Sequence, residues 1–239
     1  MDDAMRINLW SGPRNVSTAV MYAFRERPDT SVVDEPLYAH YLCRTGAEHP
    51  AVQDVIKSQD TDGEAVVRTV LLGPSPTPVR FFKHMAHHLE ALDTEFLGEM
   101  DNILLTRDPE QMLPSLINQV PNVEIEGTSL PMQVRLLDWI LERGGSPLVI
   151  ESKRLLTDPE ATLRAVCGAL DLDWDPGMLS WEEGPKPEDG VWAQHWYHNV
   201  HRSTGFDPYE AKTDPFPKHL QPLLKKCIPL YERLLEYAI

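Results

Sequence analysis

The sequence is poor in cysteine and in uninterrupted apolar stretches. Its 239 residues include three cysteines, Cys43, Cys167 and Cys227, with no Cys-x-x-Cys pair or Cys/His cluster. This count predicts neither a disulfide framework nor a zinc site. No apolar run approaches the ~20 residues of a membrane span. The first residues also lack the basic and apolar regions of a signal peptide. We therefore expect a cytoplasmic protein that does not associate with membranes.

Positive charge is also scarce. The chain has 22 Lys and Arg residues against 37 Asp and Glu, which gives a formal net charge of −15. Because nucleic-acid binding needs a basic surface to neutralise phosphates, this balance argues against a nucleic-acid partner. Any site for an anion must gather its cations locally. The hydrophobic content of 42% is that of an ordinary globular protein.

Short apolar runs alternate with segments of helical periodicity along the whole chain. The segments predicted as strands are residues 7–10, 31–34, 79–82, 102–105 and 148–150, and those predicted as helices are 17–27, 54–72, 128–143, 220–235 and a stretch opening at 158–159. The first strand, helix and strand form a compact βαβ unit, which implies parallel strands. We predict a three-layer α/β fold in one domain, residues 1–239, with a central, mostly parallel sheet flanked by helices.

Residues 171–216 are rich in Trp, Pro, His and Gly and show no periodicity. A structureless segment of this length in a compact domain is usually functional, so we interpret it as a candidate lid. His195, His198 and His201 follow one another at a spacing of three residues and offer a metal site as an alternative. Zinc sites usually add sulfur or carboxylate ligands. We favour a segment that covers a ligand and expect no metal.

The segment Ser-Gly-Pro-Arg-Asn-Val-Ser-Thr, residues 11–18, lies between the first predicted strand and the first predicted helix. At such a place backbone N–H groups and the helix dipole attract anions. Arg14 adds a forked cation, and Ser17 and Thr18 add hydroxyl groups. The loop lacks the Gly-Lys-[Ser/Thr] ending of a Walker A motif, which disfavours a Mg-ATP or Mg-GTP enzyme. The alternative is an ordinary turn with Ser17 as the helix N-cap.

A second arginine follows the fourth predicted strand. Arg107 stands at the carboxyl end of this strand, where open α/β sheets bind ligands, and Ser115 follows two helical turns later. Between them, Asp108 is a predicted N-cap, with Pro109 at N1 and Gln111 at N3. Arg107 and Ser115 so placed can hold a second phosphate. The alternative is that Arg107 pairs with a surface carboxylate.

Together these two motifs resemble those of sulfotransferases that use 3′-phosphoadenosine-5′-phosphosulfate (PAPS). The Arg107-Asp-Pro segment with Ser115 is similar to their 3′-phosphate-binding segment, and residues 13–18 resemble their Pro-Lys-Ser-Gly-Thr-Thr loop. Here Arg14 replaces the Lys and Val16 replaces the Gly. Looser matches are residues 150–174 and the Gly-Val-Trp at 190–192. The resemblance implies nucleotide contacts from Gly12, Pro13, Arg14, Asn15, Val16, Ser17, Thr18, Arg107 and Ser115.

The resemblance further implies a P-loop-type fold and transfer of a sulfuryl group from PAPS to a hydroxyl or amine of a small-molecule acceptor, without a metal. Arg14 would offset charge on the leaving phosphate. Two residues are candidates for the base. His84 partly matches the family's Lys-x-His segment, with His87 and His88 as alternatives, and Glu35 follows the second predicted strand, where some branches use a carboxylate.

Two other functions stay open from the sequence. One is a P-loop kinase or nucleotide phosphohydrolase, which would need magnesium ligands. The other is a module of the same fold that binds nucleotide without chemistry. The acceptor is left open among alcohols, phenols, amines, sugars and lipids, and the oligomeric state is left open as well.

Overall fold

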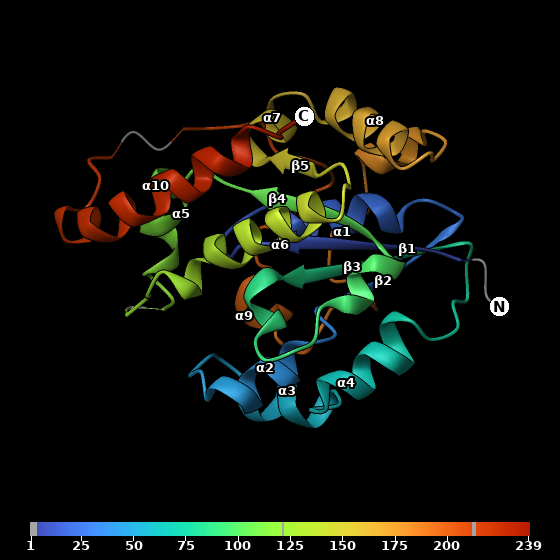
Figure 1. Ribbon diagram of the computed structural model, residues 1–239. Helices are drawn as coiled ribbons and strands as arrows, with labels where there is room; N and C mark the ends of the chain where they lie inside the picture. Colours follow the sequence, from blue (N-terminus) through green and yellow to red (C-terminus); the bar gives the residue numbers. More distant parts are fainter. Residues whose placement is uncertain (1–3, 121, 212–213) are drawn as a thin grey trace.

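The computed structural model describes residues 4–120, 122–211 and 214–239. Within them five strands form an all-parallel sheet in the order β2-β3-β1-β4-β5 (Figure 1). The strands are β1 (Met5–Ser11), β2 (Thr30–Asp34), β3 (Val79–Met85), β4 (Asp101–Thr106) and β5 (Leu148–Glu151). Helices cover both faces of this sheet. The predicted three-layer α/β fold with a parallel sheet is therefore confirmed.

The helices are α1 (Ser17–Arg25), α2 (Tyr38–Thr45), α3 (Val52–Ser58), α4 (Gly63–Val66), α5 (Pro109–Leu116), α6 (Leu130–Glu142), α7 (Ser152–Thr157), α8 (Pro159–Ala169), α9 (Ala193–Trp196) and α10 (Gln221–Leu235). Helices α5, α6 and α10 pack on one face of the sheet, and α1 and α8 pack on the other. Because side chains alternate along a strand, Trp10 and Phe82 enter the first core and Leu9 and Phe81 the second.

The region predicted as one helix over 54–72 is broken in two. Helix α3 ends at Ser58, and Gln59 is extended. Asp62 then caps α4, since its carboxylate accepts hydrogen bonds from the N–H groups of Glu64 and Ala65. A π-helical turn, Val67–Leu71, completes the segment. Asp favours a cap over a helix interior, so an aspartate inside the predicted helix begins a new one.

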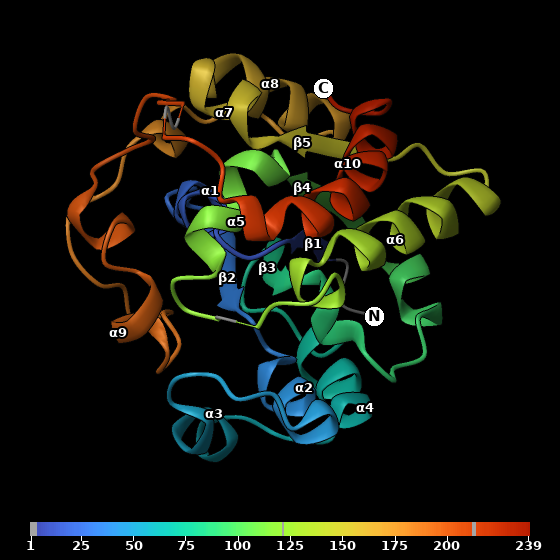
Figure 2. The same cartoon turned by 90° about the vertical axis from the view of Figure 1, so that its left-hand side faces the viewer.

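The topology places a crevice at the carboxyl ends of the strands. β1 lies between β3 and β4, so the connections that leave β1 and β4 diverge to different sides. Such a switch point is where open α/β sheets bind ligands. Figure 2 looks onto these strand ends, with α9 on one side and α2 and α3 below. Among the described residues, no helix combines the length and apolar character that a bilayer crossing demands.

Candidate active site

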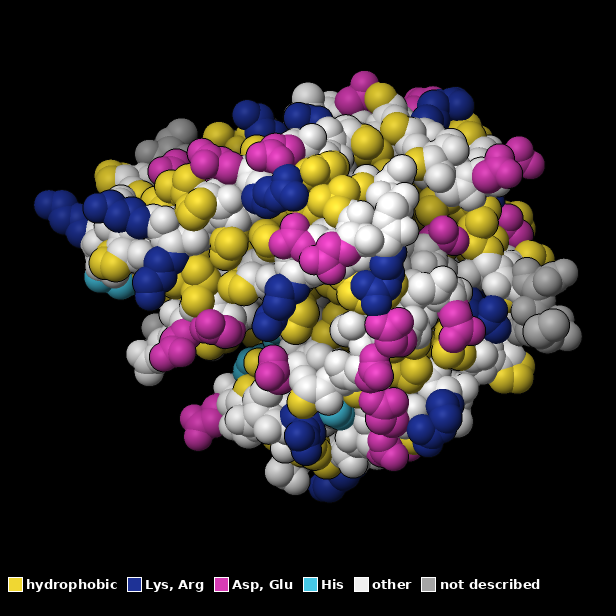
Figure 3. Space-filling view, in the orientation of Figure 1, with side chains coloured by type: hydrophobic (Ala, Val, Ile, Leu, Met, Phe, Trp, Pro, Cys, Tyr) yellow, Lys and Arg dark blue, Asp and Glu magenta, His cyan; other side chains and the backbone are white. Residues whose placement is uncertain are grey.

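A cavity of about 700 Å³ opens at the carboxyl ends of the strands. Its wall comes from the loop and first turn over 12–19, from Glu35 after β2, from the end of β3, from Arg107 after β4, and from 192–210, which is part of a late segment over 189–211. Figure 3 shows the molecule indented between the part that carries α10 and the part that carries α2 and α3. The volume lies within the ~300–1,000 Å³ typical of small-molecule sites.

The loop between β1 and α1 holds its shape through Asn15. The Asn15 side chain donates to the Leu105 carbonyl oxygen at 3.0 Å and accepts from the Val16 N–H at 2.9 Å. The left-handed residue of the loop is Arg14, with φ of 55°. Val16 has φ of −93°, which a β-branched residue adopts without strain, so the Val found here in place of the family's Gly fits this backbone.

Helix α1 begins without a side-chain cap. Its N-cap residue is Val16, and no side-chain oxygen of the residues that the structure describes bonds the first-turn N–H groups. The alternative of Ser17 as an N-cap is therefore wrong. Ser17 and Thr18 instead line the cavity, as do Gly12 and Pro13. Uncapped amides at the start of a helix leave the positive end of its dipole free to bind an anion.

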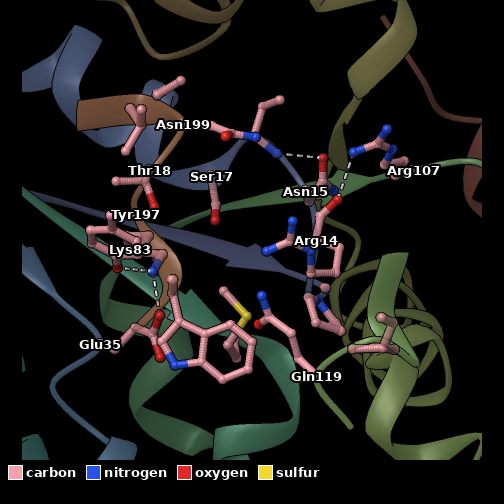
Figure 4. Close-up of a pocket in the computed structure, with 18 of the residues that line it drawn as sticks. Arg14, Asn15, Ser17, Thr18, Glu35, Lys83, Arg107, Gln119, Tyr197 and Asn199 are labelled. Carbon is pink, nitrogen blue, oxygen red and sulfur yellow. Dashed lines mark hydrogen bonds and ion pairs between the residues drawn. The ribbon is translucent and has the colours of Figure 1, made fainter. Parts of the chain in front are cut away.

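Arg14 and Arg107 meet in this cavity (Figure 4). A guanidinium N–H of Arg107 donates to the backbone oxygen of Arg14 at 2.7 Å, and both side chains line the same wall. Across the described ranges, neither arginine forms an ion pair with a carboxylate. Burial lowers the pKa of both, and the charge of Arg14 lowers that of Arg107 further. Two unpaired, partly desolvated cations in an acidic protein fit an anionic ligand.

Ser115 lies differently from the prediction. Its hydroxyl accepts a hydrogen bond from Nε of Arg14 at 2.9 Å, and it is not among the residues that line the cavity. Ser115 therefore orients Arg14 and leaves the other nitrogens of that guanidinium facing the cavity.

At the other end of the cavity, Glu35 belongs to a buried charge cluster. Lys83 forms an ion pair with Glu35, a second one with Asp34 at 3.1 Å, and a hydrogen bond to the Tyr197 hydroxyl at 2.6 Å. The Tyr197 hydroxyl donates to Asp34 at 2.8 Å. Glu35 also has a left-handed backbone, with φ of 40°. The sequence analysis assigned no role to Lys83, Asp34 or Tyr197, although Lys83 directly precedes the candidate base His84.

Protonation in this cluster follows from burial and charge. Burial raises the pKa of Glu35, the neighbouring Asp34 charge raises it further, and the positive charge of Lys83 opposes both. Burial alone would lower the pKa of Lys83, but its two carboxylate partners outweigh burial and raise it. Lys83 is therefore charged, and Glu35 is a carboxylate that takes up a proton more readily than an exposed one.

His84 lies away from the cavity. Its ring stacks on Trp10 with centroids 4.1 Å apart, and its Nε2 lies 3.1 Å from the side-chain oxygen of Asn8. Burial lowers its pKa to about 3. Strand alternation explains the difference, because Lys83 and Met85 line the cavity while His84 faces the opposite core. Of the two predicted bases, the structure brings only Glu35 to the cavity.

The two alternative histidines do line the cavity. His88 Nδ1 lies 3.8 Å from a Glu35 carboxylate oxygen, and His87 Nδ1 lies 2.5 Å from the Ser129 hydroxyl oxygen. Burial is the main reason why the pKa of each of these two histidines is lowered.

The late segment is attached to the body of the protein by buried carboxylates. Asp189 accepts from the Tyr22 hydroxyl at 2.8 Å and lies 2.9 Å from His201 Nε2. Asp34 accepts from the Gly190 N–H at 3.1 Å. The three histidines named as an alternative metal site do not assemble: His195 and His198 are exposed, and the described part of the chain contains no group of three metal-binding side chains.

Comparisons with known proteins agree with this geometry. The model of the sulfotransferase domain family matches residues 5–238, so the chain belongs to that family. Two relatives from Arabidopsis thaliana, branched-chain-amino-acid aminotransferase-like proteins 2 and 1, are 38% and 39% identical over 229 residues. These matches cover 95% of the chain but 41% of each relative, so the chain spans about two-fifths of their length.

Two solved structures share the fold. The sulfotransferase domain from the curacin biosynthetic pathway is 16% identical with a TM-score of 0.53, over 95% of this chain and 98% of that one. A sulfotransferase from Alicyclobacillus acidocaldarius is 11% identical with a TM-score of 0.53, over 99% and 98%. The predicted family and P-loop-type fold are confirmed.

Proposed function

We propose that this chain is a sulfotransferase that takes its sulfuryl group from PAPS and passes it to a hydroxyl group of a small acceptor. One observation carries the proposal: Arg14 and Arg107, which have no carboxylate partner among the described residues, line one cavity together with the uncapped start of α1. PAPS carries negative charge at both its 5′- and 3′-positions, so it can engage both cations at once.

Separate groups of residues bind the nucleotide and activate the acceptor. The amides at the start of α1 and the Arg14 guanidinium hold the 5′-phosphosulfate, and Arg107 holds the 3′-phosphate. Ser115 acts through Arg14, whose Nε it binds. Glu35 accepts the proton of the acceptor hydroxyl. As the acceptor oxygen bonds to sulfur, the bond from sulfur to the phosphate oxygen breaks, and its electron pair stays on that oxygen beside Arg14.

The names of the Arabidopsis relatives do not enter this proposal. Those proteins are more than twice as long as the match, and an aminotransferase-like name describes a whole protein of which this chain matches 41%.

Calorimetric titration with 3′,5′-ADP, the desulfated product, tests the proposal against ATP·Mg. Arg14→Ala and Arg107→Ala each remove a charged hydrogen-bond donor, so each should weaken 3′,5′-ADP binding by roughly 10- to 100-fold. Arg164→Ala is the matched control, because Arg164 lies exposed on α8 in an ion pair with Glu160.

Tighter binding of ATP·Mg than of 3′,5′-ADP would favour the kinase or phosphohydrolase. If both arginine variants bound 3′,5′-ADP as tightly as wild type, the proposed nucleotide site would be wrong. Tight 3′,5′-ADP binding with no release of 3′,5′-ADP from PAPS, whatever the acceptor, would indicate a module that binds nucleotide without chemistry.

A further inference from the structure

The end of the cavity around Glu35 is walled by rings. Its aromatic subsite comprises six cavity-lining side chains from α2, the following loop, β3's exit and α9: Tyr38, Tyr41, His49, His88, Trp192 and Trp196. Three segments far apart in the sequence contribute to it. Figure 4 draws Arg107 on the opposite side of the pocket from Glu35, with Arg14 between them.

The rings of this subsite are in contact with one another. His88 is sandwiched between Tyr38, at 4.7 Å between centroids, and Tyr41, at 4.8 Å, with interplanar angles of 13° and 26°. Trp192 meets Tyr38 edge-on at 5.1 Å. Tyr38, Trp192 and His88 are 1–3% exposed, so the wall is packed before any acceptor enters. A rigid wall of ring faces and edges suits a flat apolar ligand.

The charge of the subsite excludes an anionic acceptor. Burial lowers the pKa of His49 and His88, so these imidazoles are neutral at physiological pH. The nearest ammonium group, on Lys83, is already paired with Asp34 and Glu35. Other charges near this end are negative, as with the exposed Glu48 on the cavity wall. Once the nucleotide occupies Arg14, a carboxylate or phosphate on the acceptor would find no free cation among the described residues of this subsite.

The polar atoms of the wall suit a single hydroxyl group better than a polyol. The Tyr38 hydroxyl is engaged with His49 Nδ1 at 2.9 Å, and His87 Nδ1 with Ser129. The Glu35 carboxylate lies at this end of the cavity and accepts hydrogen bonds. A sugar loses water from every hydroxyl it buries and needs a partner for each one.

We infer that the acceptor is a phenol or aromatic alcohol without an anionic group, whose ring packs in the aromatic subsite while its hydroxyl reaches Glu35. This inference rests on the proposed function of the same cavity. The reaction conserves charge: the phenolic oxygen bonds to sulfur, its proton moves to Glu35, and the electron pair of the broken bond leaves with 3′,5′-ADP. The raised pKa of Glu35 helps, because it brings the base closer to the pKa of ~10 of a phenol.

An acceptor series of matched size tests this inference. Release of 3′,5′-ADP from PAPS is measured with 4-ethylphenol, 4-hydroxyphenylacetate, 4-ethylcyclohexanol and glucose. We expect kcat/KM for 4-ethylphenol to exceed that of each of the others by about tenfold or more, because each change buries an unpaired negative charge, unpaired hydroxyls or a non-planar body. A higher value for the anion, the cyclohexanol or the sugar overturns the inference.

A binding measurement separates this inference from the proposed function. Titration of 4-ethylphenol and 4-hydroxyphenylacetate into protein saturated with 3′,5′-ADP should show tighter binding of the neutral phenol. Tyr41→Leu should weaken binding of 4-ethylphenol by about 3- to 10-fold through loss of ring contact. It should leave the Kd for 3′,5′-ADP unchanged. Tyr237→Leu, outside the cavity near the C-terminus, is the control and should change neither.

Absence of 3′,5′-ADP binding would contradict the proposed function itself. Normal 3′,5′-ADP binding with equal or tighter binding of the anionic phenol, or with no effect of Tyr41→Leu, would contradict only the acceptor assignment.

Discussion

Arg14 and Arg107 carry like charges, and their proximity has an energetic cost. Burial removes water from each guanidinium group and lowers the pKa of both arginines. The positive charge of Arg14 lowers the pKa of Arg107 further. Arginine nevertheless stays protonated in proteins. Repulsion between the two guanidinium groups and their lost hydration is relieved when an anion binds between them. Although the net charge is −15, these two cations have no carboxylate partner in the described part of the structure, which is the physical basis of the proposed nucleotide site.

At this scale, Glu35→Gln tests the base. The amide keeps the size of the side chain but cannot accept the proton, so kcat should fall by about 10²- to 10⁴-fold. The Kd for 3′,5′-ADP should stay within about threefold, because Glu35 lies at the acceptor end of the cavity. Steady-state kinetics and calorimetry measure the two quantities. His84→Gln is the comparison, and a loss of kcat as large there as in Glu35→Gln would return His84 to the role of base.

The pH dependence of turnover follows from the same residue. Glu35 works as a base only when it is ionised, so activity should fall as pH drops through its pKa. Because burial raises that pKa, the acid limb of kcat/KM should lie above the ~4.3 of an ordinary glutamate. A pH–rate profile with a midpoint at or below that of an exposed carboxylate would contradict the assignment.

At the scale of elements, the aspartate of the Arg-Asp-Pro motif has a structural role. Asp108 caps α5 by accepting from the Glu110 N–H at 2.8 Å, which fixes the helix that carries Ser115. Asp108→Ala should lower the free energy of unfolding by about 1 kcal/mol in urea titrations. Asp158→Ala, at the N-cap of α8, is the matched control and should cost a similar amount.

Only the first of these two variants should weaken 3′,5′-ADP binding, because α5 positions Arg14 through Ser115 whereas α8 contributes no residue to the cavity. Equal nucleotide affinity in Asp108→Ala and wild type would show that the motif aspartate acts on stability alone.

Local patterns explain why the elements were largely predictable. The buried strand β5 reads as an apolar run, and Asp108-Pro109 marks the start of α5 at the residue predicted. The face of the sheet on which a polar strand residue lies depends on the strand's register, which is set by pairing across the sheet. The register therefore determines that Lys83, and not His84, points to the cavity. Tyr197 could not be placed from the sequence, since its partners Lys83 and Asp34 lie 114 and 163 positions away.

At the scale of the whole molecule, the cluster of Asp34, Glu35, Lys83 and Tyr197 joins β2 and β3 to the late segment. The Lys83 side chain is 2% exposed and the Asp34 side chain 1%. Removal of the Lys83 ammonium group would leave the Asp34 and Glu35 carboxylates buried without a cation. The stability of the protein would then depend strongly on whether these carboxylates are ionised.

Lys83→Met should therefore lower the free energy of unfolding by about 3–5 kcal/mol at pH 8. Without the ammonium group, burial keeps the pKa of Glu35 in the folded variant above its unfolded value of ~4.3. The penalty from Glu35 is thus fully present above its folded pKa and shrinks as pH falls through it. Urea unfolding of variant and wild type at pH 5.5 and pH 8 should show the smaller difference at pH 5.5.

Tyr197→Phe provides the contrast, because it removes one hydroxyl and keeps the ion pairs of Lys83 with Asp34 and Glu35. Its cost should be about 1 kcal/mol and should change little between the two pH values, since the substitution removes a neutral hydroxyl and Glu35 titrates beside Lys83 in both proteins. If the Lys83→Met penalty were equally independent of pH, the carboxylates would have to be solvated in the variant. The late segment would then have separated from β2 and β3, and the wall of the acceptor site with it.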